Sequence, residues 1–181
     1  PIKSSAASDV YKRQAYYRRT QQEGHDLCVV NLGHSATFLY IYRGGHFASR
    51  REIEAGMSDL EHLVADQCSV DIHVAHEYVR QNYNHVLESE QARELYGRIA
   101  VEVVKAVNFF NYNNRERELT QLCLCGGGSA IQPLYDTIAD TTGMTLHPSA
   151  ELLGQRMSTE EPWMYLRAIG GVDLGIKGGL R

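Results

Sequence analysis

Two short turns carry the residues whose types and spacing could do chemistry. One turn runs through three consecutive glycines, 126–128, to Ser129, and the other runs from Gly33 to Ser35. Consecutive glycines let a backbone approach a ligand closely and adopt positive φ without a Cβ clash. A helix predicted to begin near Ala130 would point its free N–H groups at the same spot, where an anion such as phosphate is favoured. The spacing suits a tight strand-to-helix turn without a ligand equally well, so the motif leaves both interpretations open.

Apolar runs and helical periodicity predict the elements that position these two turns. Strands are expected at 27–32, 36–43 and 46–54, joined by the turn at 33–35 and by a hairpin at Gly44-Gly45. Helices are expected from 57 with Ser58 as N-cap, at 70–84, and at 89–110 with Ser89 as N-cap. A strand at 119–125, a helix at 130–142 ended by Gly143, a short strand at 144–147 and a last helix at 160–169 complete the order.

The composition is that of an ordinary globular protein. The chain has 181 residues, 43% of them hydrophobic and 22% charged, and its net charge of −4 comes without a basic block, which argues against nucleic acid as the main partner. Four cysteines without C-x-x-C spacing are typical of reduced, structural thiols, and a zinc site is not expected. No apolar run approaches the roughly 18 residues of a membrane span, so direct membrane insertion is not expected.

The chain is expected to divide into three parts. Residues 4–14 read like an in-frame translation of a common sequencing-library adapter, and we treat residues 1–14 as an artefact outside the fold. Residues 15–171 are predicted to form one domain, the C-terminal half of a larger protein. The glycine-rich residues 172–181 are predicted to be a flexible tail.

The order of elements predicts an α/β fold and resembles that of the ribonuclease-H-like half of an actin-type ATPase. In that half a mixed sheet, three antiparallel strands and then two further strands, is flanked by helices. Residues 30–37, V-N-L-G-H-S-A-T, resemble the second phosphate-binding loop of that superfamily, usually D-x-G-x-x-T or D-x-G-x-x-S. Residues 124–134, L-C-G-G-G-S-A-I-Q-P-L, resemble its adenosine motif, and Ala168 to Gly171 is similar to its C-terminal connecting motif.

Within this superfamily the chain most resembles the PilM-like type IV pilus assembly proteins. The shared features are the strand triplet, the helix ending in N-F-F-N-Y, and the C-G-G-G-S-A-I turn, and the resemblance covers roughly residues 15–171. It implies a cytoplasmic scaffold held at the inner face of the cytoplasmic membrane through partners. The implied partners are a PilN-type bitopic membrane protein, which in relatives docks on the N-terminal half, and other pilus assembly components.

The resemblance also implies a nucleotide site formed by the two turns at adjacent strand ends. ATP and magnesium would be cofactors of the full-length parent, and neither is expected to bind this fragment well alone. The implied contacts are Asn31, Gly33, His34 and Ser35 in the first loop, and Gly126, Gly127, Gly128 and Ser129 in the second.

The chain departs from the family pattern at two places that matter for catalysis. Asn31 stands where hydrolysing relatives have a carboxylate that helps to hold magnesium, and an amide binds hard cations more weakly. Many relatives have an acid and a lysine on the helix near Ala75, where this chain has His76 and Val79. We therefore assign no catalytic residue and no resident metal, and hydrolysis is not expected.

Two other functions are weighed against this one. An active actin-fold ATPase or small-molecule kinase would need a carboxylate base and magnesium ligands, which Asn31 disfavours. A dinucleotide-binding domain is disfavoured because Ile131 stands where a third glycine belongs, and because hairpins replace βαβ units. The residues leave open whether the system assembles pili, secretes proteins or takes up DNA.

Overall fold

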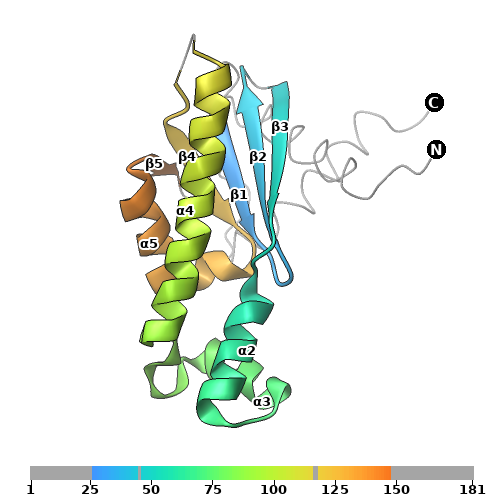
Figure 1. Cartoon of the computed structure of the whole chain (residues 1–181), viewed down its shortest axis with the longest axis vertical. Helices are drawn as coiled ribbons and strands as arrows, with labels where there is room; N and C mark the ends of the chain where they lie inside the picture. Colours follow the sequence, from blue (N-terminus) through green and yellow to red (C-terminus); the bar gives the residue numbers. More distant parts are fainter. Residues whose placement is uncertain (1–25, 45, 116–117, 148–181) are drawn as a thin grey trace, which may run out of the picture.

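The computed structural model describes residues 26–44, 46–115 and 118–147, which build a five-stranded mixed sheet with helices packed against it (Figure 1). The strand order is β3-β2-β1-β4-β5. The strands are β1 (Leu27–Leu32), β2 (Thr37–Arg43), β3 (His46–Ile53), β4 (Gln121–Cys125) and β5 (Thr145–His147). The first three pair antiparallel, whereas β4 runs parallel to β1 and β5 parallel to β4. The predicted fold class, three antiparallel strands and then two further strands, is confirmed.

The helices divide into two groups. They are α2 (Met57–Cys68), α3 (Ile72–Gln81), α4 (Glu90–Asn113) and α5 (Gln132–Thr142), with short 3₁₀ turns η1 (Tyr83–Glu88) and η2 (Gly127–Ala130). The long helix α4 crosses the sheet and packs against α5, whereas α2 and α3 lie beyond the end of the sheet at which β1 and β4 finish (Figure 1). The α2–α3 pair therefore lies beside the two turns of interest.

The hydrophobic cluster formed by the described residues lies between the sheet and α4. The buried stripe of α4 follows the predicted three- and four-residue spacing. All of the predicted residues are buried, and so are two more: Ala92, Leu95, Ile99, Val103, Ala106, Val107 and Phe110, together with Tyr96 and Ala100. Alternate residues of β1 face it, because successive side chains of a strand point to opposite faces; Cys28, Val30 and Leu32 belong to this cluster. Burial raises the pKa of the Cys28 thiol to about 12, so this cysteine is a neutral core residue.

The predicted caps have different outcomes. Ser89 caps α4 as expected, since its Oγ accepts a hydrogen bond from the Ala92 N–H at 3.3 Å. Ser58 as the cap of α2 is wrong: the helix already begins at Met57 and its N-cap is Gly56. The reason is tertiary, because the N–H groups of Met57 and Ser58 donate to carbonyls of the β1–β2 loop and so need no side-chain cap.

Several element boundaries also differ from expectation: the helix expected at 70–84 is found at 72–81, and the strand expected at 119–125 is found at 121–125. Two further differences have local reasons. The helix α4 runs to Asn113, beyond the predicted end at 110, because the side-chain amides of Asn113 and Asn114 donate to the carbonyls of Phe109 and Phe110. The helix expected from 130 starts at 132, because residues 127–130 form the 3₁₀ turn η2 first. Gly143 ends α5 with φ of 61°, as predicted.

Several predictions lie outside the described residues. They are the segment 1–14, Gly45 of the hairpin, the last helix at 160–169 and the tail at 172–181. None of the helices in the described ranges is both long enough and apolar enough to cross a membrane.

Ile99→Ala should destabilise the chain strongly, because Ile99 is fully buried at the centre of the α4 stripe. We expect a loss of about 2–5 kcal/mol in the free energy of unfolding, measured by urea titration. Val101→Ala on the same helix is the matched control, since Val101 is 45% exposed and should change stability by less than about 0.5 kcal/mol. Equal effects of the two variants would contradict the position of the core.

Candidate functional site

The two predicted turns leave the sheet side by side. β1 and β4 are parallel neighbours, and Asn31 pairs with Cys125 in their register. The loop that begins at Gly33 and the turn that begins at Gly126 therefore start one residue or two beyond this pair, at the same edge of the sheet (Figure 1). The expected adjacency of the two turns is confirmed.

Gly126 makes the closest contact between the two turns. Its φ is +87°, and a Cβ built on it would lie 2.6 Å from the Leu32 carbonyl oxygen and 2.9 Å from Asn31 Oδ1. Asn31 also contacts the neighbouring strand, because Cys125 Sγ donates to Asn31 Oδ1 at 3.7 Å. The Asn31 amide thus lies between the two turns and touches the backbone of the second one.

The first loop is held by the start of α2. The N–H of Met57 donates to the Gly33 carbonyl at 3.0 Å, and the N–H of Ser58 donates to the His34 carbonyl at 2.8 Å. Gly56 packs directly beneath the loop, since a Cβ on it would collide with the His34 carbonyl oxygen. These contacts turn the loop carbonyls toward α2. Within the part of the chain that the structure describes, the N–H groups of His34 and Ser35 have no hydrogen-bond partner.

The residues of the glycine turn play different parts. Ser129 closes the turn internally, because its Oγ and its N–H both donate to the Gly126 carbonyl, at 2.7 and 3.1 Å. Gly128 is buried, and a Cβ on it would meet Leu32 and Met57. Gly127 is exposed, and no atom lies within 4 Å of the position that its Cβ would take. Gly127 is therefore the residue of this turn with free space above it.

Two histidines converge on one buried carboxylate beside the first loop. Glu61 of α2 is 8% exposed, and its Oε1 lies 2.8 Å from His76 Nδ1 and 3.7 Å from His34 Nδ1. His76 thus reaches the loop region, as its alignment with the acid of relatives implies, whereas Val79 is half-buried in the core. Sequence reasoning missed Glu61. The available signal was a carboxylate at the buried helical spacing of Met57 and Val64.

The donor set of this region suits an anion better than a metal. It consists of backbone N–H groups, the neutral amide of Asn31, and imidazoles whose shared carboxylate is already hydrogen-bonded. Across the described ranges, no group of three or more His, Cys, Asp or Glu side chains is arranged to hold a metal ion. Hard divalent cations prefer carboxylate oxygens, so Asn31 does not fit the magnesium that the fold implies.

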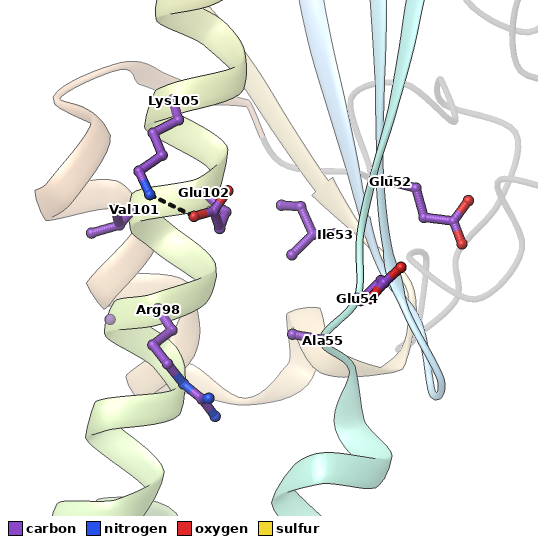
Figure 2. A pocket seen from close by; sticks show the side chains of 9 residues that line it. Glu52, Ile53, Glu54, Ala55, Arg98, Val101, Glu102 and Lys105 are labelled. Atoms are coloured by element: carbon purple, nitrogen blue, oxygen red, sulfur yellow. Dashed lines mark hydrogen bonds and ion pairs between the residues drawn. The ribbon is translucent and has the colours of Figure 1, made fainter.

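A hollow of about 650 Å³ lies elsewhere, between α4 and the end of β3. Figure 2 shows the α4 side chains of Arg98, Val101, Glu102 and Lys105 across this hollow from residues 52–55. Lys105 Nζ donates to Glu102 Oε1 at 2.7 Å, so these charges pair along the helix. None of the turn residues lines the hollow, and its side chains form no arrangement with an obvious reaction.

Solved structures define the class of protein to which this fold belongs. The chain is similar to a protein of the PilM–PilN type IV pilus biogenesis complex, with TM-score 0.72 and 19% identity over 96% of this chain and 52% of that one. It is also similar to the ethanolamine utilization protein EutJ from Carboxydothermus hydrogenoformans, with TM-score 0.67 and 13% identity over 90% and 54% of the two chains. The archaeal actin homologue Ta0583 follows, with TM-score 0.65 and 15% identity over 94% and 55%. The chain has an actin-like fold and spans about half the length of these proteins.

The sequence itself identifies the family. A family model for the type IV pilus assembly protein PilM matches residues 2–161. The chain therefore belongs to the PilM family of type IV pilus assembly proteins. No curated protein sequence matches the chain.

Gly126→Ala should destabilise the fold, because the new methyl group would collide with the end of β1 and the positive φ disfavours any L side chain. We expect a loss of about 2 kcal/mol or more in the free energy of unfolding. Gly127→Ala, one residue along, is the matched control, since its methyl group would enter open space. Urea titration of both variants tests the contact. A Gly126→Ala protein as stable as Gly127→Ala would contradict it.

Proposed function

We propose that this chain is the nucleotide-binding C-terminal half of a cytoplasmic scaffold for type IV pilus assembly or a related secretion system. The whole protein binds the cytoplasmic tail of a PilN-type bitopic membrane protein and is held at the inner face of the membrane by that contact and by other assembly components. The family membership and the PilM–PilN complex among similar structures support the scaffold and the partner.

One observation carries the nucleotide part of the proposal. The first loop and the glycine turn start at the same edge of the sheet, and Gly126 lies against the Leu32 backbone and the Asn31 side chain. Ligands of open α/β sheets bind outside the carboxyl ends of parallel strands, which is where these turns lie. The first loop offers free N–H groups to phosphates, and the open space above Gly127 can accept the flat face of a nucleoside.

The proposed scaffold binds nucleotide without hydrolysing it. Asn31 carries no charge, is a poor base and does not fit magnesium, and hydrolysis of a phosphoanhydride depends on both functions. This is the observation that disfavours the alternative, an active actin-fold ATPase or small-molecule kinase.

The partner is tested by capture. A protein with both halves of the fold should retain a synthetic peptide of a PilN-type cytoplasmic tail, whereas a scrambled peptide should be lost. The present chain alone should retain neither, because the tail docks on the other half. Failure of the two-half protein to retain the tail would overturn the scaffold function.

Nucleotide binding is tested at Gly127. In the two-half protein, Gly127→Glu should weaken binding of a fluorescent ATP analogue at least roughly tenfold, because the added carboxylate fills the open space and repels phosphates. Gly127→Ala should bind within a few-fold of the parent, and both variants should keep its melting temperature. Magnesium-dependent ATP turnover above background would contradict the non-hydrolysing scaffold. Unchanged binding by Gly127→Glu would contradict the position of the nucleoside.

A further inference from the structure

The carboxylate of Glu61 organises two imidazoles at the mouth of the first loop. His76 Nδ1 lies 2.8 Å and His34 Nδ1 lies 3.7 Å from the same oxygen, Oε1. The Glu61 side chain is only 10% exposed, whereas those of His34 and His76 are 63% and 56% exposed. A buried carboxylate is costly unless it is paired, and here both of its partners reach it from the solvent side.

The three residues come from three different elements that pack together. His34 belongs to the loop whose carbonyls accept the first N–H groups of α2, and Glu61 lies one helical turn beyond Met57 on that helix. His76 comes from α3. In the residues that the structure describes, Glu61 is the hydrogen-bond or ion-pair partner of both rings, and neither Nε2 has a partner.

This arrangement prepares both rings to meet an anion. His76 Nδ1 is at hydrogen-bond distance from the carboxylate, and when Nδ1–H donates to it, a second proton binds at Nε2 and the ring then donates from Nε2. His34 Nδ1, at 3.7 Å, forms an ion pair with the same carboxylate when its ring is protonated. With both rings protonated, the pair and Glu61 together carry one net positive charge. The other charged groups nearby on α3 are Glu77 and Arg80, which pair with each other at 2.8 Å. The hydrogen bond from Arg80 lowers the pKa of Glu77 most, and the charge of His76 lowers it further, so this carboxylate stays ionised beside His76.

We propose that His34 and His76, oriented by Glu61, form a phosphate-binding pair. This pair supplies positive charge to the phosphates, in place of a divalent cation held by a carboxylate at position 31. The inference rests on the proposed function, in which the phosphates of a nucleotide lie at the first loop. It follows that the site binds nucleotide without a divalent cation. It also follows that binding takes up protons, since an arriving phosphate favours the charged rings.

The experiment is calorimetry of ADP and tripolyphosphate binding to the two-half protein at pH 7.5. Titrations in EDTA and in magnesium compare affinity, and titrations in buffers of different ionisation enthalpy count the protons taken up. We expect similar affinity in EDTA and in magnesium, with uptake of a substantial fraction of a proton. His34→Asn should weaken binding in EDTA roughly tenfold, because one charge-assisted hydrogen bond is lost, and should reduce the proton uptake, because one of the two rings is lost.

Two further variants separate this role from a structural one. Glu61→Gln keeps the volume of the side chain but not its charge, and it should also reduce the proton uptake. His73→Gln is the matched control, since His73 lies one turn before His76 on α3 and does not contact Glu61. It should behave like the parent, and melting temperatures confirm that each variant folds.

The outcomes distinguish the inference from the function on which it rests. Binding that requires magnesium, takes up no protons and is unchanged in Glu61→Gln and His34→Asn would overturn the imidazole pair and leave the nucleotide site standing. Absence of binding by both ADP and tripolyphosphate in every condition would overturn the nucleotide site as well. Capture of the PilN-type tail is measured separately and is unaffected by either result.

Discussion

The contact between Gly126 and the end of β1 is the constraint on which the functional edge of this molecule depends. The backbone of β4 leaves the sheet so close to Leu32 and Asn31 that no side chain fits at position 126. Because β4 pairs in parallel with β1, the turn after it and the loop after β1 begin at the same level. The close approach therefore sets the spacing of the two turns, and a residue with a Cβ would force them apart.

A second close contact, between Gly56 and the first loop, holds the start of α2 against the same edge of the sheet. Gly56 packs beneath the first loop, and the next two N–H groups of the chain donate to the loop carbonyls. The loop carbonyls thus satisfy the N–H groups of the first turn of α2 in place of a side-chain cap, which fixes the direction of α2 relative to the end of β1. Because of this direction, Glu61, one turn after Met57 on α2, lies beside the loop. His76 of α3 contacts Glu61 there. The cluster of Glu61 with two histidines is a consequence of how the helix is capped.

The sequence predicts most of the fold because most of it depends on local periodicity. The strand at 27–32 and the strand expected at 119–125, which is found at 121–125, follow from short apolar runs. The buried stripe of α4 follows from three- and four-residue spacing. What could not be predicted depends on atoms distant in the chain. Ser58 was a reasonable cap by residue type, yet the carbonyls of residues 33 and 34 satisfy the helix instead. Glu61 carries no motif, and only the meeting of three elements reveals its role.

The backbone shape of the two adjacent turns and the charges of the side chains around them carry different information. The shape depends on glycines and on strand pairing, and the overall fold is similar to that of proteins only 13–19% identical to this chain. The charges depend on single side chains, which can change while every backbone contact is kept. Replacing a carboxylate by the Asn31 amide leaves the contact with the glycine turn possible but removes the charge that a hard cation requires. The fold of this chain therefore defines its class of protein, whereas the chemistry that we propose for the site depends on the Asn31 amide and on the two imidazoles at the first loop.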